Sequence, residues 1–94
     1  MLFRKNTQFS RLIKAGGRLK EFNFRKPSPE SKIYEVDVSD ERGNRFMFTM
    51  VQQDEDWVME GSLMPEWITS VETLLRDAIR EEENDFNKIE SDMG

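Results

Sequence analysis

The sequence of 94 residues contains neither cysteine nor histidine. Without cysteine, the chain forms no disulfide, offers no thiolate ligand to zinc and has no cysteine nucleophile. Without histidine, it also lacks the commonest protein ligand for metals and the commonest general base near neutral pH. We therefore predict that the protein uses no metal or other cofactor. Small secreted domains usually depend on disulfides, so the same absence favours a cytoplasmic location.

Long hydrophobic runs are also missing. A helix needs about 20 mostly apolar residues to span a bilayer, and no stretch of this sequence approaches that length. The first residues, MLFRKNTQFSRLIKAGGR, lack the apolar core of a secretory signal, but they are basic and free of acidic residues, as in organellar transit peptides. We favour the simpler interpretation of a short amphipathic helix, and we expect no contact with a membrane.

Charge is distributed unevenly along the chain. Residues 1–26 hold eight Lys or Arg and one acidic residue, a net charge of +7, whereas residues 27–94 hold six and eighteen, a net charge of −12. The basic end can therefore meet an anionic partner or fold against the acidic remainder of the chain. The second arrangement needs no partner, so we prefer it.

The spacing of apolar residues predicts a short helix over residues 7–15, followed by four strands. Phe9, Leu12 and Ile13 share one face at helical spacing, and the two glycines after this segment would end the helix. The four predicted strands lie between turns rich in Gly, Pro, Asn and Asp and cover residues 18–26, 32–39, 45–52 and 56–61. Their short connections favour an antiparallel meander.

A longer helix is predicted from Pro65, which suits the first helical position. Its apolar residues recur at helical spacing: Trp67, Ile68, Val71, Leu74, Leu75, Ala78 and Ile79. The predicted fold is a two-layer α+β domain with the order α-β-β-β-β-α, in which the long helix packs on one face of the sheet. We assign the domain to residues 1–82 and expect a flexible acidic tail over residues 83–94, where apolar residues are scarce.

Two phenylalanines lie among basic residues in the first predicted strand. Phe22 and Phe24 could stack on nucleic-acid bases. They also fall in phase with the inner rows of the next two strands, which are Tyr34, Val36, Val38, Phe46, Phe48 and Met50. A domain this small needs its large apolar side chains inside, so we place both rings in the core.

No catalytic motif is present. Ser62 has no histidine or cysteine to activate it, and we interpret it as a turn or cap residue. Glu35 with Asp37, and the acidic turn at residues 54–56, contain carboxylates that could do acid–base chemistry. Both sets are predicted to be exposed, where carboxylates keep ordinary pKa values. We predict that the protein is not an enzyme.

Nucleic-acid binding is the main alternative to a protein-interaction role. Proteins that bind single strands hold phosphates with basic residues and stack bases on aromatic rings. The candidate contacts are the basic residues of the N-terminal segment and the first strand: Arg4, Lys5, Arg11, Lys14, Arg18, Lys20, Arg25 and Lys26.

The outer face of the predicted sheet is half apolar. One helix covers one face only, so the other face is covered by the N-terminal helix or by a second copy of the chain. The candidate self-association face consists of Leu19, Met47, Thr49 and Val51. The preferred function is a small non-catalytic binding module whose partner is a protein, either another chain or a second copy in a homodimer.

Overall fold

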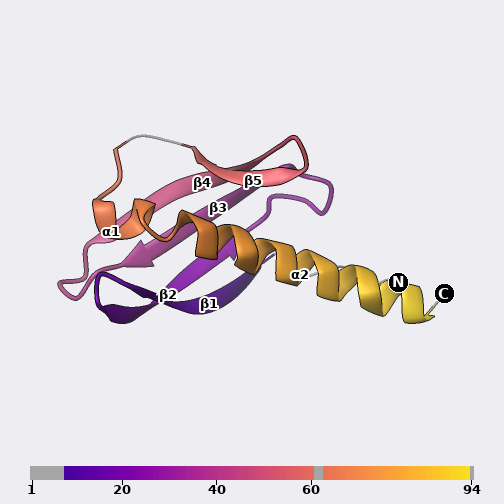
Figure 1. The fold of residues 1–94 in the computed structure, drawn as a ribbon, viewed down its shortest axis with the longest axis horizontal. Helices are drawn as coiled ribbons and strands as arrows, with labels where there is room; N and C mark the ends of the chain where they lie inside the picture. Colours follow the sequence, from indigo (N-terminus) through magenta and orange to yellow (C-terminus); the bar gives the residue numbers. More distant parts are fainter. Residues whose placement is uncertain (1–7, 61–62, 94) are drawn as a thin grey trace.

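The computed structural model describes residues 8–60 and 63–93, with side chains described through residue 84. The elements are β1 Gln8–Ala15, β2 Arg18–Arg25, β3 Ile33–Ser39, β4 Arg45–Gln53, β5 Asp56–Glu60, α1 Glu66–Thr69 and α2 Glu72–Met93. The five strands pair antiparallel in chain order and form a curled, half-barrel sheet, and the two helices follow at the C-terminal end (Figure 1). The chain thus has the order β-β-β-β-β-α-α, and the predicted order α-β-β-β-β-α is wrong.

The predicted N-terminal helix is a strand. Residues of β1 pair in unbroken register with β2, from Gln8 opposite Arg25 to Ala15 opposite Arg18. The two glycines that follow Ala15 have φ values of 63° and 83°. Two consecutive residues with positive φ form the tight turn of a hairpin whose twist matches its strands. The glycine pair therefore joins two strands instead of ending a helix.

The single long helix predicted from Pro65 is a pair of helices. The N–H of Val71 donates to the carbonyl of Ile68, three residues back, at 3.1 Å. This tighter 3₁₀-type bond separates α1 from α2. Ile68, Val71 and Leu75 are all buried, so the apolar stripe continues across the break.

The core lies between the sheet and the two helices. The inner rows of the sheet are buried, and Phe22 and Phe24 are 0% and 1% exposed. The placement of these two rings in the core is confirmed. The largest side chains that are fully buried are Phe22, Phe24, Met50, Ile68, Leu75, Ile79, Val36 and Val38.

Gly16 is restricted by its conformation and by a neighbour. Its φ is +63°, and an added Cβ would lie 3.1 Å from the Cβ of Trp67, whereas an added Cβ at Gly17 meets nothing within 4 Å. We expect Gly17→Ala to lower the free energy of unfolding by about 1–2 kcal/mol, the cost of the left-handed conformation. Gly16→Ala should cost about 1 kcal/mol more, because it also crowds Trp67. Urea unfolding of the two variants tests this, and equal losses would contradict the crowding.

Both helices lie on the same side of the sheet, and α2 crosses that inner face in front of the strands (Figure 1). Within residues 8–60 and 63–93, no element covers the outer face. The prediction that an N-terminal helix covers it is therefore wrong, because the segment concerned is itself part of the sheet. Neither described helix is long and apolar enough to cross a membrane. The division into a domain and a flexible tail stays a prediction, and the backbone of α2 runs through Met93.

Candidate functional site

The described basic residues that were predicted to contact an anion lie on β1, on β2 and directly after β2, and most are paired with acidic residues. Arg11 on β1 contacts Glu81 at 3.0 Å and Glu82 at 3.2 Å, both on α2. On β2, Arg25 pairs with Glu35 of β3. Lys14 is exposed and has no ion pair with another described residue. Arg4 and Lys5 lie outside the described residues.

Lys20 holds the first hairpin against the rest of the protein. Its ammonium donates to the carbonyl of Ala15 at 2.6 Å and lies 3.1 Å from Glu41 and 4.7 Å from the centre of the Trp67 ring. Arg18 lies 3.7 Å from the same Glu41 carboxylate. The hydrogen bond from Lys20 lowers the pKa of Glu41. Lys20 is itself buried, so it is a structural cation and not one that is open to a ligand.

Lys26 forms a second internal site with Tyr34 and Glu83. One carboxylate oxygen of Glu83 accepts a hydrogen bond from Lys26 at 2.7 Å and another from the Tyr34 hydroxyl at 2.8 Å. The Lys26 side chain is only 10% exposed, and its ammonium lies 5.2 Å from the centre of the Tyr34 ring. Burial, followed by the bond to Glu83, raises the pKa of Tyr34. Lys26 is therefore paired with an acidic residue within the fold, as Lys20 is.

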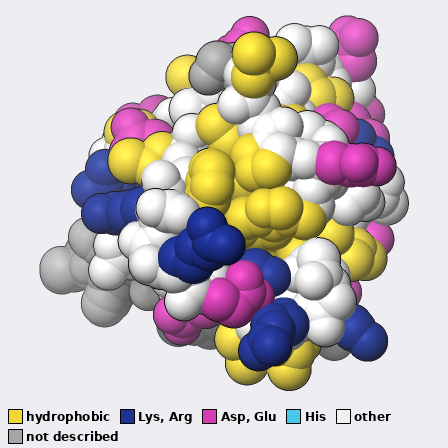
Figure 2. Space-filling model, turned by 90° about the vertical axis from the view of Figure 1, so that its left-hand side faces the viewer, with side chains coloured by type: hydrophobic (Ala, Val, Ile, Leu, Met, Phe, Trp, Pro, Cys, Tyr) yellow, Lys and Arg dark blue, Asp and Glu magenta, His cyan; other side chains and the backbone are white. Residues whose placement is uncertain are grey.

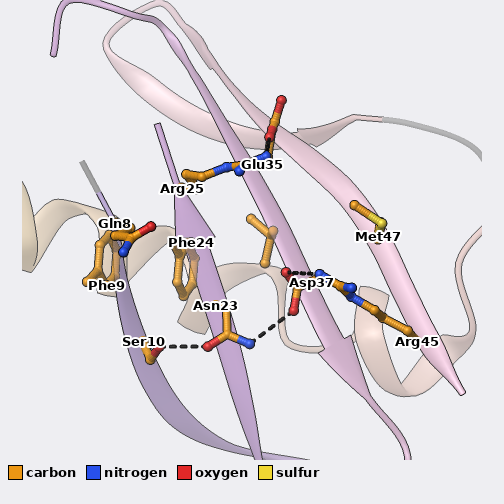
Figure 3. Close-up of a pocket in the computed structure, with 11 residues that line it drawn as sticks. Gln8, Phe9, Ser10, Asn23, Phe24, Arg25, Glu35, Asp37, Arg45 and Met47 are labelled. Carbon is orange, nitrogen blue, oxygen red and sulfur yellow. Dashed lines mark hydrogen bonds and ion pairs between the residues drawn. The ribbon is translucent and has the colours of Figure 1, made fainter. Parts of the chain in front are cut away.

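A polar network occupies a hollow on the outer face of the sheet (Figure 3). The hollow has a volume of about 610 Å³. The Ser10 hydroxyl donates to Asn23 at 2.6 Å, the Asn23 amide donates to Asp37 at 3.0 Å, and Arg45 donates to the other Asp37 oxygen at 3.1 Å. The charged side chains at this hollow pair with one another: Arg25 with Glu35, and Arg45 with Asp37. The hollow therefore presents no cluster of unpaired charges of one sign.

The residues of the predicted self-association face all lie on the outer side of the sheet, but they do not form one patch. Met47, Thr49 and Val51 alternate along β4, whereas Leu19 lies on β2. Leu19 and Met47 are 68% and 58% exposed, and the other two residues are half-buried. Strand β3, whose outer face carries Glu35 and Asp37, separates Leu19 from the β4 residues.

Three of the five carboxylates considered for catalysis have structural partners. Glu35 pairs with Arg25, and Asp37 with Arg45. In the acidic turn, Asp56 lies 3.1 Å from Arg80. Among the described residues, no group of three or more Asp or Glu is placed to hold a metal ion. Ser62 lies outside the described residues.

Hydrophobic side chains also gather at the end of the molecule that carries α1 (Figure 2). Phe46, Met64 and Trp67 pack partly buried against the core, and the rings of Phe46 and Trp67 meet edge to face at 5.5 Å. Leu63, next to this group in the chain, is 97% exposed. Charged side chains border this apolar surface (Figure 2). One of them, Lys20, lies over the Trp67 ring and already bonds Ala15 and Glu41.

The two edges of the sheet differ in how their backbone groups are satisfied. At the β5 edge, Arg76 donates to the carbonyl of Trp57 at 2.7 Å, and Glu72 accepts from the N–H of Met59 at 2.8 Å. The N–H of Trp57 also donates to the side chain of Asp56 at 3.0 Å. Side chains of α2 and of the strand itself therefore occupy this edge.

No described residue pairs with the β1 edge, so this edge is open within the part of the chain that the structure describes. Ala15 and Arg18 flank the two-residue turn and form a hydrogen-bonded pair. From there along the hairpin, hydrogen-bonded pairs alternate with pairs that are not hydrogen-bonded. The backbone groups of Ser10, Leu12 and Lys14 consequently point away from β2. None of them has a hydrogen-bond partner among the described residues. Sequence reasoning missed this edge because it interpreted the segment as a helix.

A groove runs between the open β1 edge and α2. It has a volume of about 350 Å³, and apolar and charged residues line it equally: Arg11, Leu12, Ile13 and Lys14 on the strand side, and Leu74, Asp77, Ala78 and Glu81 on the helix side. Leu12 is 66% exposed and Leu74 48% exposed. A strand placed beside β1 would direct every second side chain into this groove, because side chains alternate between the faces of a sheet.

Comparison with known protein families, curated proteins and solved structures found no match to the chain.

Proposed function

We propose that the protein is a non-catalytic interaction module that binds a polypeptide segment by adding it to the sheet as a further strand beside β1. The observation that carries this proposal is the difference between the two sheet edges. Strand addition gives affinity through main-chain hydrogen bonds and specificity through pockets for alternate side chains. The β1 edge offers backbone groups of Ser10, Leu12 and Lys14, and the groove beside α2 offers the pocket.

The β1 strand lacks most of the features that protect natural edge strands from pairing. Such edges are usually short, bulged, interrupted by proline or covered. β1 has eight residues, no proline and a continuous register with β2. Its inward-pointing charge, Arg11, is neutralised by Glu81 and Glu82. An edge of this kind is suited to a partner strand.

The proposed partner class is protein, either another chain or a second copy of this one. Nucleic acid is less favoured, because Phe22 and Phe24 are buried and cannot stack on bases. Of the candidate basic residues that the structure describes, all except Lys14 form ion pairs within the fold. The absence of cysteine from the sequence favours the cytoplasm as the location of this module.

Replacement of Leu12 tests the proposal. The N–H of Leu12 points out of the sheet, so Leu12→Pro removes a donor to an added strand without breaking a bond to β2. Peptides selected from a random display library against the wild-type protein should bind the Leu12→Pro variant at least about tenfold more weakly. Leu12→Ala is the matched control: it keeps the N–H and should lose less affinity.

Two results would contradict the proposal. One is that no peptide is enriched, or that the enriched peptides bind the proline variant as well as the wild type. The other is that a labelled single-stranded oligothymidylate binds at low salt with an affinity that falls steeply as salt is added. That salt dependence is the signature of phosphate contacts and would support the nucleic-acid alternative instead.

A further inference from the structure

We infer that the strand added to β1 is β1 of a second copy, so that two five-stranded sheets join into one continuous sheet about a two-fold axis at Leu12. This inference rests on the proposed function, because it uses the same open edge and names its occupant. A two-fold pair of this kind is isologous: the same patch of each copy faces its equivalent.

The alternation of backbone groups limits the registers in which β1 can pair with itself. The outward groups belong to the even-numbered residues of β1, so an antiparallel self-pair must join even residues to even residues. Within the range 8–15, two such registers pair seven residues of each copy, and all others pair fewer. One is centred on Arg11 and the other on Leu12.

Charge distinguishes the two long registers. The register centred on Arg11 places two arginines directly opposite each other, and like charges in that position are destabilising. In the register centred on Leu12, Arg11 lies opposite Ile13 and Lys14 lies opposite Ser10. No like charges face each other within the paired strands. The sequence of β1 is therefore self-complementary about Leu12.

Exposed leucines supply the apolar contact for this pair. Leu12 and Leu19 are 66% and 68% exposed. Leu12 pairs with Glu21 and Lys14 pairs with Leu19, so the two leucines are diagonal neighbours on the outer face of the hairpin. In the dimer, Leu12 of each copy meets its equivalent at the axis, with Leu19 beyond it on each side. A row of four leucines then crosses the junction between the two sheets.

Sedimentation tests the association. An interface made mainly of one strand from each copy is at the small end of specific interfaces, so we expect a dimer with a dissociation constant in the micromolar range, about 1–100 μM. Leu12→Pro and Leu12→Lys should each weaken it at least about tenfold, the first by removing a donor and the second by placing two charges at the axis. Val51→Lys, on the outer face of β4, is the matched control and should leave the dimer intact.

A single cysteine tests the register, and the chain has no native cysteine to interfere. At the axis, the two Cα atoms of residue 12 would lie about 5.5 Å apart, a separation that a disulfide spans. Leu12→Cys should therefore form a covalent dimer under mild oxidation. Lys14→Cys should not, because its equivalent would lie about 13 Å away along the strand, beyond the reach of a disulfide.

Each result separates this inference from the proposed function. A monomer at every concentration overturns the dimer, and binding of selected peptides that depends on the Leu12 N–H would still support strand addition by another chain. A dimer that Val51→Lys dissociates and Leu12→Lys does not would also overturn the inference, in favour of the β4 face. Equal cross-linking of Leu12→Cys and Lys14→Cys overturns the register. Loss of the dimer in both Leu12 variants, with cross-linking confined to Leu12→Cys, supports the inference.

Discussion

Phe24→Ala is expected to lower the free energy of unfolding by about 3–5 kcal/mol, the range for removal of a buried aromatic ring. The Phe24 side chain is 1% exposed. Its ring stacks on Phe9 with the centres 4.5 Å apart and meets Tyr34 edge to face at 6.3 Å. A chain of this length has a total stability of about 5–14 kcal/mol. The substitution would therefore remove a large share of it.

Urea unfolding followed by tryptophan fluorescence measures this loss. Leu19→Ala is the matched control on the same strand, because Leu19 is 68% exposed and points to the opposite face. We expect it to change the stability of the monomer by less than about 0.5 kcal/mol. A Phe24→Ala variant as stable as this control would show that the ring is not packed in the core, and would restore its role as a candidate base-stacking residue.

The second large effect is a loss of stability at alkaline pH. Burial, and then the hydrogen bond to Glu83, raise the pKa of Tyr34 above its ordinary value. In the unfolded chain this phenol loses its proton near about pH 10. Above that pH the unfolded state binds fewer protons than the folded state, so stability falls as pH rises, by up to about 1.4 kcal/mol per pH unit. The stabilisation is fully present below about pH 10.

Unfolding measured between about pH 8 and pH 12 tests this linkage. Tyr34→Phe is the control. Its free energy of unfolding near pH 7 should be lower by about 1 kcal/mol, because the hydrogen bond to Glu83 is lost. Above about pH 10 its stability should fall less steeply with pH than that of the wild type, because it has no phenol to ionise. Tyr34 is the only tyrosine in the chain, so phenolate absorbance reports it directly. Ionisation near pH 10 in the folded protein, or equal slopes in the two proteins, would show that Tyr34 is not held as described.

The sequence allowed the four strands between residues 18 and 61 and the buried rows to be predicted, because their alternation is local. The N-terminal segment could not be assigned in this way. Phe9 and Ile13 lie on one face in a helix and also on one face in a strand. The strand interpretation places Arg11 in the inner row beside them, which disfavours it. Its counter-charges, Glu81 and Glu82, are 70 and 71 residues away in the chain, where no local pattern reveals them.

The open edge was missed for the same reason. Once the segment before Gly16 is interpreted as a helix, the strand that follows becomes the edge, and no groove beside α2 is expected. The occupied β5 edge was also hidden, because it depends on Glu72 and Arg76 reaching Trp57 and Met59 from α2. By contrast, the internal use of the basic residues was anticipated, since the acidic remainder of the chain offered partners for them.

The ion pairs between the first hairpin and α2 have a consequence for synthesis of the chain. A domain is made from its N-terminus at about 5–20 residues per second. Arg11 and Glu81 are 70 residues apart, so several seconds pass between the appearance of the first hairpin and that of its acidic partners. During this interval Arg11 lacks its partners from α2, whereas Arg18, Lys20 and Arg25 pair with Glu41 and Glu35, which are made much earlier. The ion pairs of Arg11 therefore form only after the first ten residues of α2 have been made.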